Sequence, residues 1–137
     1  MSAFSRTILI DTMDFPDEFF AHLNMHNYTE IKGGLERQTF LEIWVVAVSG
    51  RVFARSWNKS EKSWYTAFLK EGVGQLKFGD VVLNVTGKKV PEEDAVHPKI
   101  DAAYRSRYNE AKNIYYAQGI SQPEYYDYTL ELFYKPT

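Results

Sequence analysis

The fold is decided by residues 40–57, which read FLEIWVVAVSGRVFARSW. Phe40 to Val48 is nearly continuous in apolar and β-branched residues, which predicts a strand that is buried on both faces. Ser49-Gly50 has the form of a two-residue hairpin turn, and Arg51 to Trp57 is then the partner strand. We therefore expect an antiparallel strand pair in this part of the chain.

Further strands and helices are indicated on both sides of this pair. Before it, an edge strand at Arg6 to Asp11 and a short helix from Asp14 to about Asn27 are expected, with Gly33-Gly34 marking a turn. After it, the patterns predict a helix from about Glu61 to Lys70, capped by Ser60 and ended by Gly72. Two strands follow, Gln75 to Phe78 and Val81 to Thr86, joined by Gly79-Asp80. The last expected elements are a long helix from His97 to about Gln118, ended by Gly119, and a strand from Tyr125 to Tyr134.

Short turns join most of these strands, and short turns favour an antiparallel sheet. The expected fold class is α+β, with one domain over residues 1–137 whose sheet closes toward a barrel with flanking helices. A parallel βαβ fold is disfavoured because no helix separates the strands of the hairpins. An NTF2-like cone is disfavoured because the first helix is short.

Composition excludes several classes of protein. The chain has 137 residues, of which 45% are hydrophobic, and a formal net charge of −2, so it is expected to bury a core rather than remain disordered. No basic stripe for nucleic acid is visible. Cysteine is absent, which excludes disulfides and thiol chemistry and suits a cytoplasmic location. No signal peptide and no apolar stretch long enough for a membrane span is apparent.

The strand Arg51 to Trp57 is expected to have two different faces. Val52, Ala54 and Ser56 point to one side, toward the core, and the other side alternates two arginines with two aromatic rings, Arg51, Phe53, Arg55 and Trp57. Such a face suits a planar, anionic ligand, because rings stack on it and arginine pairs with phosphate. The alternative is a partly exposed sheet face with arginine–aromatic stacking and no ligand.

A longer pattern carries a resemblance to a known family. It runs from Trp44-Val45-Val46 through Gly50 to Arg55-Ser56-Trp57, and on to Ser63-Trp64-Tyr65 and Gly79. This pattern resembles a small bacterial family of unknown function, which is similar to the deazaflavin-dependent nitroreductases and, more distantly, to FMN-binding split barrels. The resemblance implies a split β-barrel homodimer that binds FMN or a deazaflavin coenzyme near the subunit interface. The activity that it implies is that of a nitroreductase-like oxidoreductase.

The resemblance also implies site residues. The matching coenzyme-binding positions are Arg55, Ser56, Trp57, Trp64 and Tyr65, with the segment from Asn58 to Tyr65 closing over the ring system. Tyr65 is a candidate hydrogen-bond donor to a substrate or ring atom. Lys32 and Arg37 lie where the nitroreductases carry a basic phosphate loop.

That loop departs from the family pattern. Glu36 stands next to Arg37, the usual basic-Ser-Gly run is missing, and Asp80 follows Gly79 where a second glycine is typical. A split barrel that has lost the coenzyme and binds another small molecule or a protein therefore remains an open alternative.

A metal site is not expected. His22 and His26 lie four residues apart on the first predicted helix, with Glu30 one turn further on. This spacing suits two ligands, but the usual context of a third is missing, so surface histidines are the default interpretation.

Overall fold

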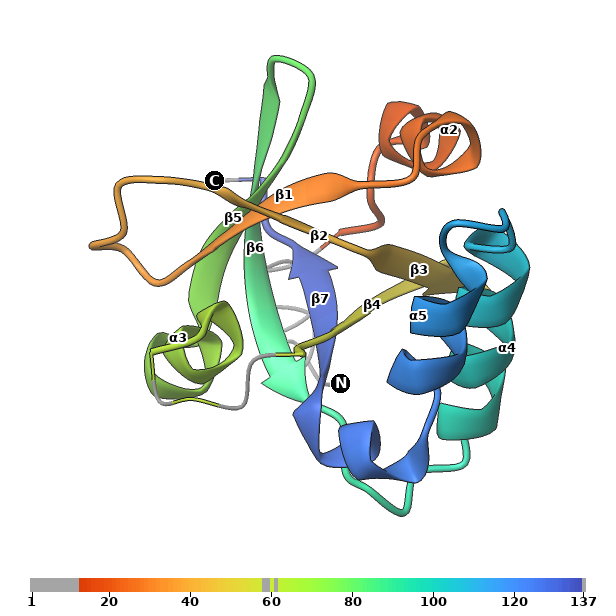
Figure 1. The fold of residues 1–137 in the computed structure, drawn as a ribbon. Helices are drawn as coiled ribbons and strands as arrows, with labels where there is room; N and C mark the ends of the chain where they lie inside the picture. The colour runs from red at the N-terminus through yellow and green to blue at the C-terminus, as the bar shows by residue number, and fades with distance from the viewer. Residues whose placement is uncertain (1–12, 58–59, 61, 137) are drawn as a thin grey trace, which may run out of the picture.

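A computed structural model of the chain describes residues 13–57, 60 and 62–136. The predicted α+β class with an antiparallel barrel is confirmed: seven strands form one sheet in the order β2-β1-β5-β6-β7-β4-β3, and every pairing is antiparallel (Figure 1). The strands are β1 (Thr29–Gly33), β2 (Leu41–Ile43), β3 (Val45–Val48), β4 (Arg51–Arg55), β5 (Val73–Phe78), β6 (Val81–Lys89) and β7 (Thr129–Tyr134).

The sheet is nearly closed because its two outermost strands are consecutive in the chain. β2 pairs with β1 at one edge, β3 pairs with β4 at the other, and only Trp44 separates them. The prediction of one continuous strand from Phe40 to Val48 was therefore wrong. The predicted burial of this segment on both faces was wrong too, because Leu41 is exposed and, of residues 40–48, only Val45 and Val46 are buried. We call the Trp44 junction the barrel seam.

Two tyrosines supply hydrogen-bond partners for the backbone at the barrel seam: Tyr104 in helix α4 (His97–Arg107), and Tyr108 at its C-terminal cap. The Tyr104 hydroxyl donates to the carbonyl of Trp44 at 3.2 Å and accepts from the amide of Arg55 at 2.9 Å. The Tyr108 hydroxyl accepts from the amide of Val45 at 3.1 Å, and the Trp44 indole stacks on its ring at 3.9 Å. Since buried edge groups need partners, these contacts explain how the sheet can change edges here.

Both predicted hairpins are confirmed. Ser49 and Gly50 have φ values of 52° and 81°, as a type I′ turn requires, and they join β3 to β4. Gly79 turns between β5 and β6. β1 was not predicted, because it ends at Gly33, the first residue of the Gly33-Gly34 turn signal, and its residues were included in the turn region.

The helices are α2 (Asp17–Met25), α3 (Trp64–Glu71), α4 (His97–Arg107) and α5 (Ile114–Ile120), followed by the 3-10 helix η1 (Pro123–Tyr128). Gly72 ends α3 as predicted, but Ser63, not Ser60, caps it by accepting from the amide of Thr66 at 3.1 Å. The single helix from His97 to Gln118 was wrong. The chain breaks after Arg107 at a segment with two asparagines, which are poor helix formers, and α5 then packs beside α4 (Figure 1).

The C-terminal strand is shorter than predicted, because residues 123–128 form η1 and β7 begins at Thr129. Gly119 lies inside α5 and does not end a helix. The edge strand predicted at Arg6 to Asp11 lies outside the described residues.

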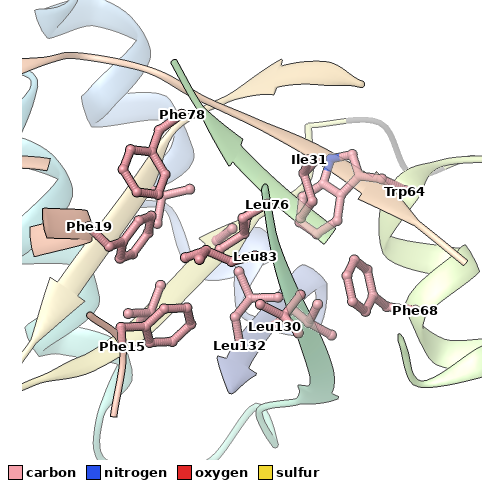
Figure 2. Packing of buried hydrophobic residues seen from close by; sticks show 14 of the residues in the cluster. Phe15, Phe19, Ile31, Trp64, Phe68, Leu76, Phe78, Leu83, Leu130 and Leu132 are labelled. Atoms are coloured by element: carbon pink, nitrogen blue, oxygen red, sulfur yellow. The ribbon is translucent and has the colours of Figure 1, made fainter. Parts of the chain in front are cut away.

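The hydrophobic core has two parts, separated by β3 and β4. The first fills the barrel, where side chains from β1, β5, β6 and β7 meet rings from α2 and α3 (Figure 2). The second lies between β3 and β4 on one side and α4 and α5 on the other. The alternation predicted for β4 is confirmed: Val52 and Ala54 belong to the first part and Phe53 to the second.

Candidate functional site

The strongest candidate site is a cavity of about 320 Å³ at the barrel seam, which we call the seam cavity. Its walls come from β2, the seam itself, the end of β4, the start of α3, and the helices α4 and α5. The lining residues are Arg37, Leu41, Glu42, Ile43, Trp44, Arg55, Trp57, Lys62, Ser63, Trp64, Tyr104 and Ile120. The volume lies at the lower end of the range for ligand sites, roughly 300–1,000 Å³.

The structure brings together four of the seven residues predicted for a site. Arg37, Arg55, Trp57 and Trp64 all line the seam cavity, although they are up to 27 positions apart in sequence. Their convergence follows from the seam, which places the loop before β2 next to the end of β4.

The other three predicted residues do not line this cavity. Ser56 is buried, and Tyr65 is buried with its hydroxyl donating to the carbonyl of Asp127 at 2.8 Å. Burial also raises the pKa of Tyr65, so the hydroxyl stays protonated and engaged. Lys32 borders a different hollow, with its ammonium group 4.8 Å from the ring centre of Phe40.

Arg55 is buried with its guanidinium engaged on all sides. Nε donates to the Thr129 hydroxyl at 2.9 Å, and one terminal nitrogen donates to Asp101 Oδ1 at 2.5 Å and to the carbonyl of Ile120 at 3.0 Å. The other terminal nitrogen contacts the ring and carbonyl of His97. All five N–H groups of an arginine are thereby directed at protein acceptors. The predicted open face is instead covered by α4 and α5 at Phe53 and Arg55, which does not fit phosphate binding by Arg55.

The protonation state of His97 follows from its two partners. Nε2 faces the carbonyl of Pro91 at 2.8 Å and must donate, while Nδ1 faces an Arg55 nitrogen at 3.1 Å and must accept. The ring is therefore neutral. Burial lowers the pKa of His97, and the charge of Arg55 lowers it further. Tyr126 stacks on this ring at 4.2 Å and donates to Asp101 at 2.5 Å, which completes the cluster.

The charges left for a ligand in the seam cavity come from its rim. Arg37 and Lys62 are exposed, and the Arg37 guanidinium donates to the carbonyl of Lys62. Glu42 is the acidic residue among the described lining residues. The rim is thus weakly cationic, while Trp57, which is 46% exposed, and Trp44 offer aromatic surface.

Sequence reasoning missed several lining residues. Lys62 and Ser63 fall in the segment that the resemblance placed over the coenzyme, so that signal could have named them. Trp44 was part of the quoted pattern, but only its position at the seam makes it a wall of the cavity. Tyr104 falls inside the helix predicted from His97 to about Gln118, and no local signal distinguished it from the rest of that helix.

The described residues contain no group of three or more His, Cys, Asp or Glu side chains placed to hold a metal ion. His22 instead contacts the carbonyl of Tyr28 and the hydroxyl of Thr29, both at 3.2 Å, and its ring stacks near His26. Within the same described ranges, no helix combines the length and apolar character of a membrane span.

Comparison with known proteins identifies the family of the chain. The model of a bacterial family, described as uncharacterized protein conserved in bacteria (DUF2255), matches residues 24–132. The chain belongs to this family. The matched range includes the barrel seam and the seam cavity. No curated protein matches the chain in sequence.

The fold of this DUF2255 chain is similar to that of a solved structure. It is the conserved hypothetical protein Rv2991 from Mycobacterium tuberculosis, with a TM-score of 0.53 and 13% sequence identity. The alignment covers 90% of this chain and 81% of the other. At that identity the likeness supports the architecture alone.

Proposed function

We propose that the chain binds a planar, anionic coenzyme of the flavin or deazaflavin class in the seam cavity and acts as a nitroreductase-like oxidoreductase. One observation carries the proposal: the seam cavity combines tryptophan side chains with a cationic rim. Aromatic walls suit a flat ring system, and arginine and lysine suit a phosphate. The resemblance of the segment from Trp44 to Tyr65 to coenzyme-binding split barrels points to the same ligand.

The residues fit the ring system better than the phosphate. Trp44 and Trp57 would border the ring, and Arg37 and Lys62 would hold the phosphate at the rim, because Arg55 is occupied by protein partners. When bound, such a coenzyme supplies hydride transfer, and the protein supplies binding and orientation. Trp64 and Tyr104, which are buried, form part of the cavity wall.

The test is a titration of purified protein with FMN and with the deazaflavin coenzyme, followed by the absorbance and fluorescence of the coenzyme. We expect micromolar binding that weakens about tenfold in Arg37→Gln, because about 1.4 kcal/mol is in keeping with one charge-assisted hydrogen bond. Lys32→Gln is the matched control, since Lys32 borders another hollow. Absence of binding at high micromolar concentrations of both coenzymes, or equal weakening by the two variants, would overturn the proposal.

The second candidate function is a barrel that has lost the coenzyme and binds another small molecule or a protein. The saturation of the Arg55 guanidinium favours it, because the arginine at the centre of the family-like pattern is not available to a phosphate. Protein that binds neither coenzyme but binds other ligands in a manner sensitive to Trp57→Ala would establish this function.

We also propose that the chain forms a homodimer with the seam cavity near the interface. Leu41 and Trp57 flank the cavity and are 56% and 46% exposed. Exposed apolar side chains beside a cavity are typical of an interface. Light scattering coupled to size exclusion should give twice the chain mass, and a monomer at high micromolar concentration would contradict the proposal.

A further inference from the structure

A second hollow, of about 490 Å³, shares a wall with the seam cavity. It is lined by Trp57, Tyr115, Tyr116, Gln118, Gly119 and Gln122, and we call it the aromatic hollow. Trp57 borders both spaces. Most residues of the aromatic hollow belong to α5, which lies beside α4 (Figure 1), whereas Trp57 follows β4 and Gln122 follows α5.

The indole of Trp57 is held in place by packing. It meets Tyr116 edge to face at 6.4 Å and Tyr125 at 5.1 Å. It also lies directly on Gly119, where an added Cβ would come within 3.0 Å of the indole. Glycine inside a helix costs stability relative to alanine, so its presence in α5 is explained by this close approach.

The chemistry of the aromatic hollow differs from that of the seam cavity. None of the described residues that line it carries a charge, whereas the seam cavity has Arg37 and Lys62 at its rim. Its rings are unusually accessible, with Tyr115 76% and Tyr116 53% exposed. The amide side chains of two glutamines border the same space. Aromatic faces with neutral amides recognise a flat, uncharged molecule that carries a hydrogen-bonding group.

We infer that the aromatic hollow binds a neutral, planar aromatic compound at a site separate from the proposed coenzyme site. The indole of Trp57 lines both spaces and lies between them. The binding site itself depends only on the residues of the hollow.

The test compares two probes of the same shape, neutral 2-naphthamide and anionic 2-naphthoate, by calorimetric titration of the coenzyme-free protein. We expect 2-naphthamide to bind more tightly than 2-naphthoate, and Tyr116→Ala to weaken it about tenfold, since one ring contact is lost. Gly119→Ala should weaken it as well by displacing the indole. Tyr28→Ala is the matched control, because Tyr28 is 54% exposed and lies away from the hollow.

Three outcomes would overturn the inference. The first is no binding of 2-naphthamide, and the second is equal binding of 2-naphthamide by Tyr116→Ala and Tyr28→Ala. The third is a change in oligomer mass in Tyr116→Ala, which would make the surface an interface between copies.

The proposed coenzyme site and the aromatic hollow can be tested independently. Arg37→Gln should weaken the coenzyme and leave 2-naphthamide unchanged, and Tyr116→Ala should do the reverse. Binding of 2-naphthamide without binding of either coenzyme would keep the hollow as a site and remove the proposed function.

Discussion

Replacing Asp101 with asparagine tests whether the buried cluster around Arg55 holds the helix pair on the barrel. Asp101→Asn keeps the size of the side chain and an oxygen that can accept from Arg55, but it removes the charge. The side chains of Arg55 and Asp101 are 0% and 10% exposed, and their nitrogen and oxygen lie 2.5 Å apart. The Arg55 guanidinium would therefore remain buried without its counter-charge, because at this depth water cannot solvate it in place of the carboxylate.

The expected loss can be worked out from these values. Two unit charges about 4 Å apart at an effective dielectric constant of about 20 attract by about 4 kcal/mol. Removal of one partner of a buried pair typically costs about 3–5 kcal/mol. Because asparagine keeps a hydrogen bond, we expect the lower end, about 3 kcal/mol. With a urea dependence of about 1.5 kcal/mol per molar, the unfolding midpoint should fall by roughly 2 M.

Asp127→Asn provides a matched control on the same kind of ion pair. Asp127 pairs with Lys89, but both side chains are about two-fifths exposed, at 42% and 41%. An exposed pair contributes at most about 1 kcal/mol, so this variant should unfold close to the original midpoint. The unfolding midpoints of both variants are measured in urea by tryptophan fluorescence and by circular dichroism. A midpoint for Asp101→Asn as high as that of Asp127→Asn would refute the reasoning.

Three further predictions follow from local contacts. Ser63→Ala should lower the free energy of unfolding by about 1 kcal/mol in urea titrations, because it removes the cap of α3, and an unchanged midpoint would contradict that role. Gly87→Ala should cost about 1–3 kcal/mol, since the new Cβ would lie 2.6 Å from the Phe68 ring; a stabilised variant would show that the ring moves aside freely. The lowered pKa of folded His97 means that the unfolded chain binds the proton more readily, so stability is lost as the pH falls below about 6.5. His97→Gln should make this dependence shallower between neutral and mildly acidic pH, and identical slopes would exclude His97 as its source.

The contacts of Arg55 give the arginine of the family-like pattern a structural role instead of a role in binding a coenzyme. Arg55 joins β4 to α4 and to the end of α5, through Asp101 and the carbonyl of Ile120. It therefore positions the helices that form one wall of the seam cavity and carry the aromatic hollow. A substitution at Arg55 would alter both spaces without removing a direct ligand contact.

Much of the candidate site could be anticipated from residues 37–65 alone. The sequence named Trp57, Trp64 and Arg37, and all three line the seam cavity. It could not show that Lys32 borders a different hollow, because Lys32 belongs to β1, a strand that the sequence did not predict. It also could not show that Arg55 is occupied, since Asp101 lies 46 positions further along the chain.

By itself, the sequence determined the local conformations of this protein. Ser49-Gly50 and Gly79 set the hairpin turns and Gly72 ends α3, because each depends on backbone angles that a few neighbouring residues decide. Only the tertiary structure decided that the strand from Phe40 to Val48 divides at Trp44, and where between His97 and Gln118 the predicted helix breaks, which is at Tyr108. The physical reason is the same for both. The two breaks meet at the barrel seam, where the Tyr108 hydroxyl bonds the backbone of Val45, a contact between residues 63 positions apart.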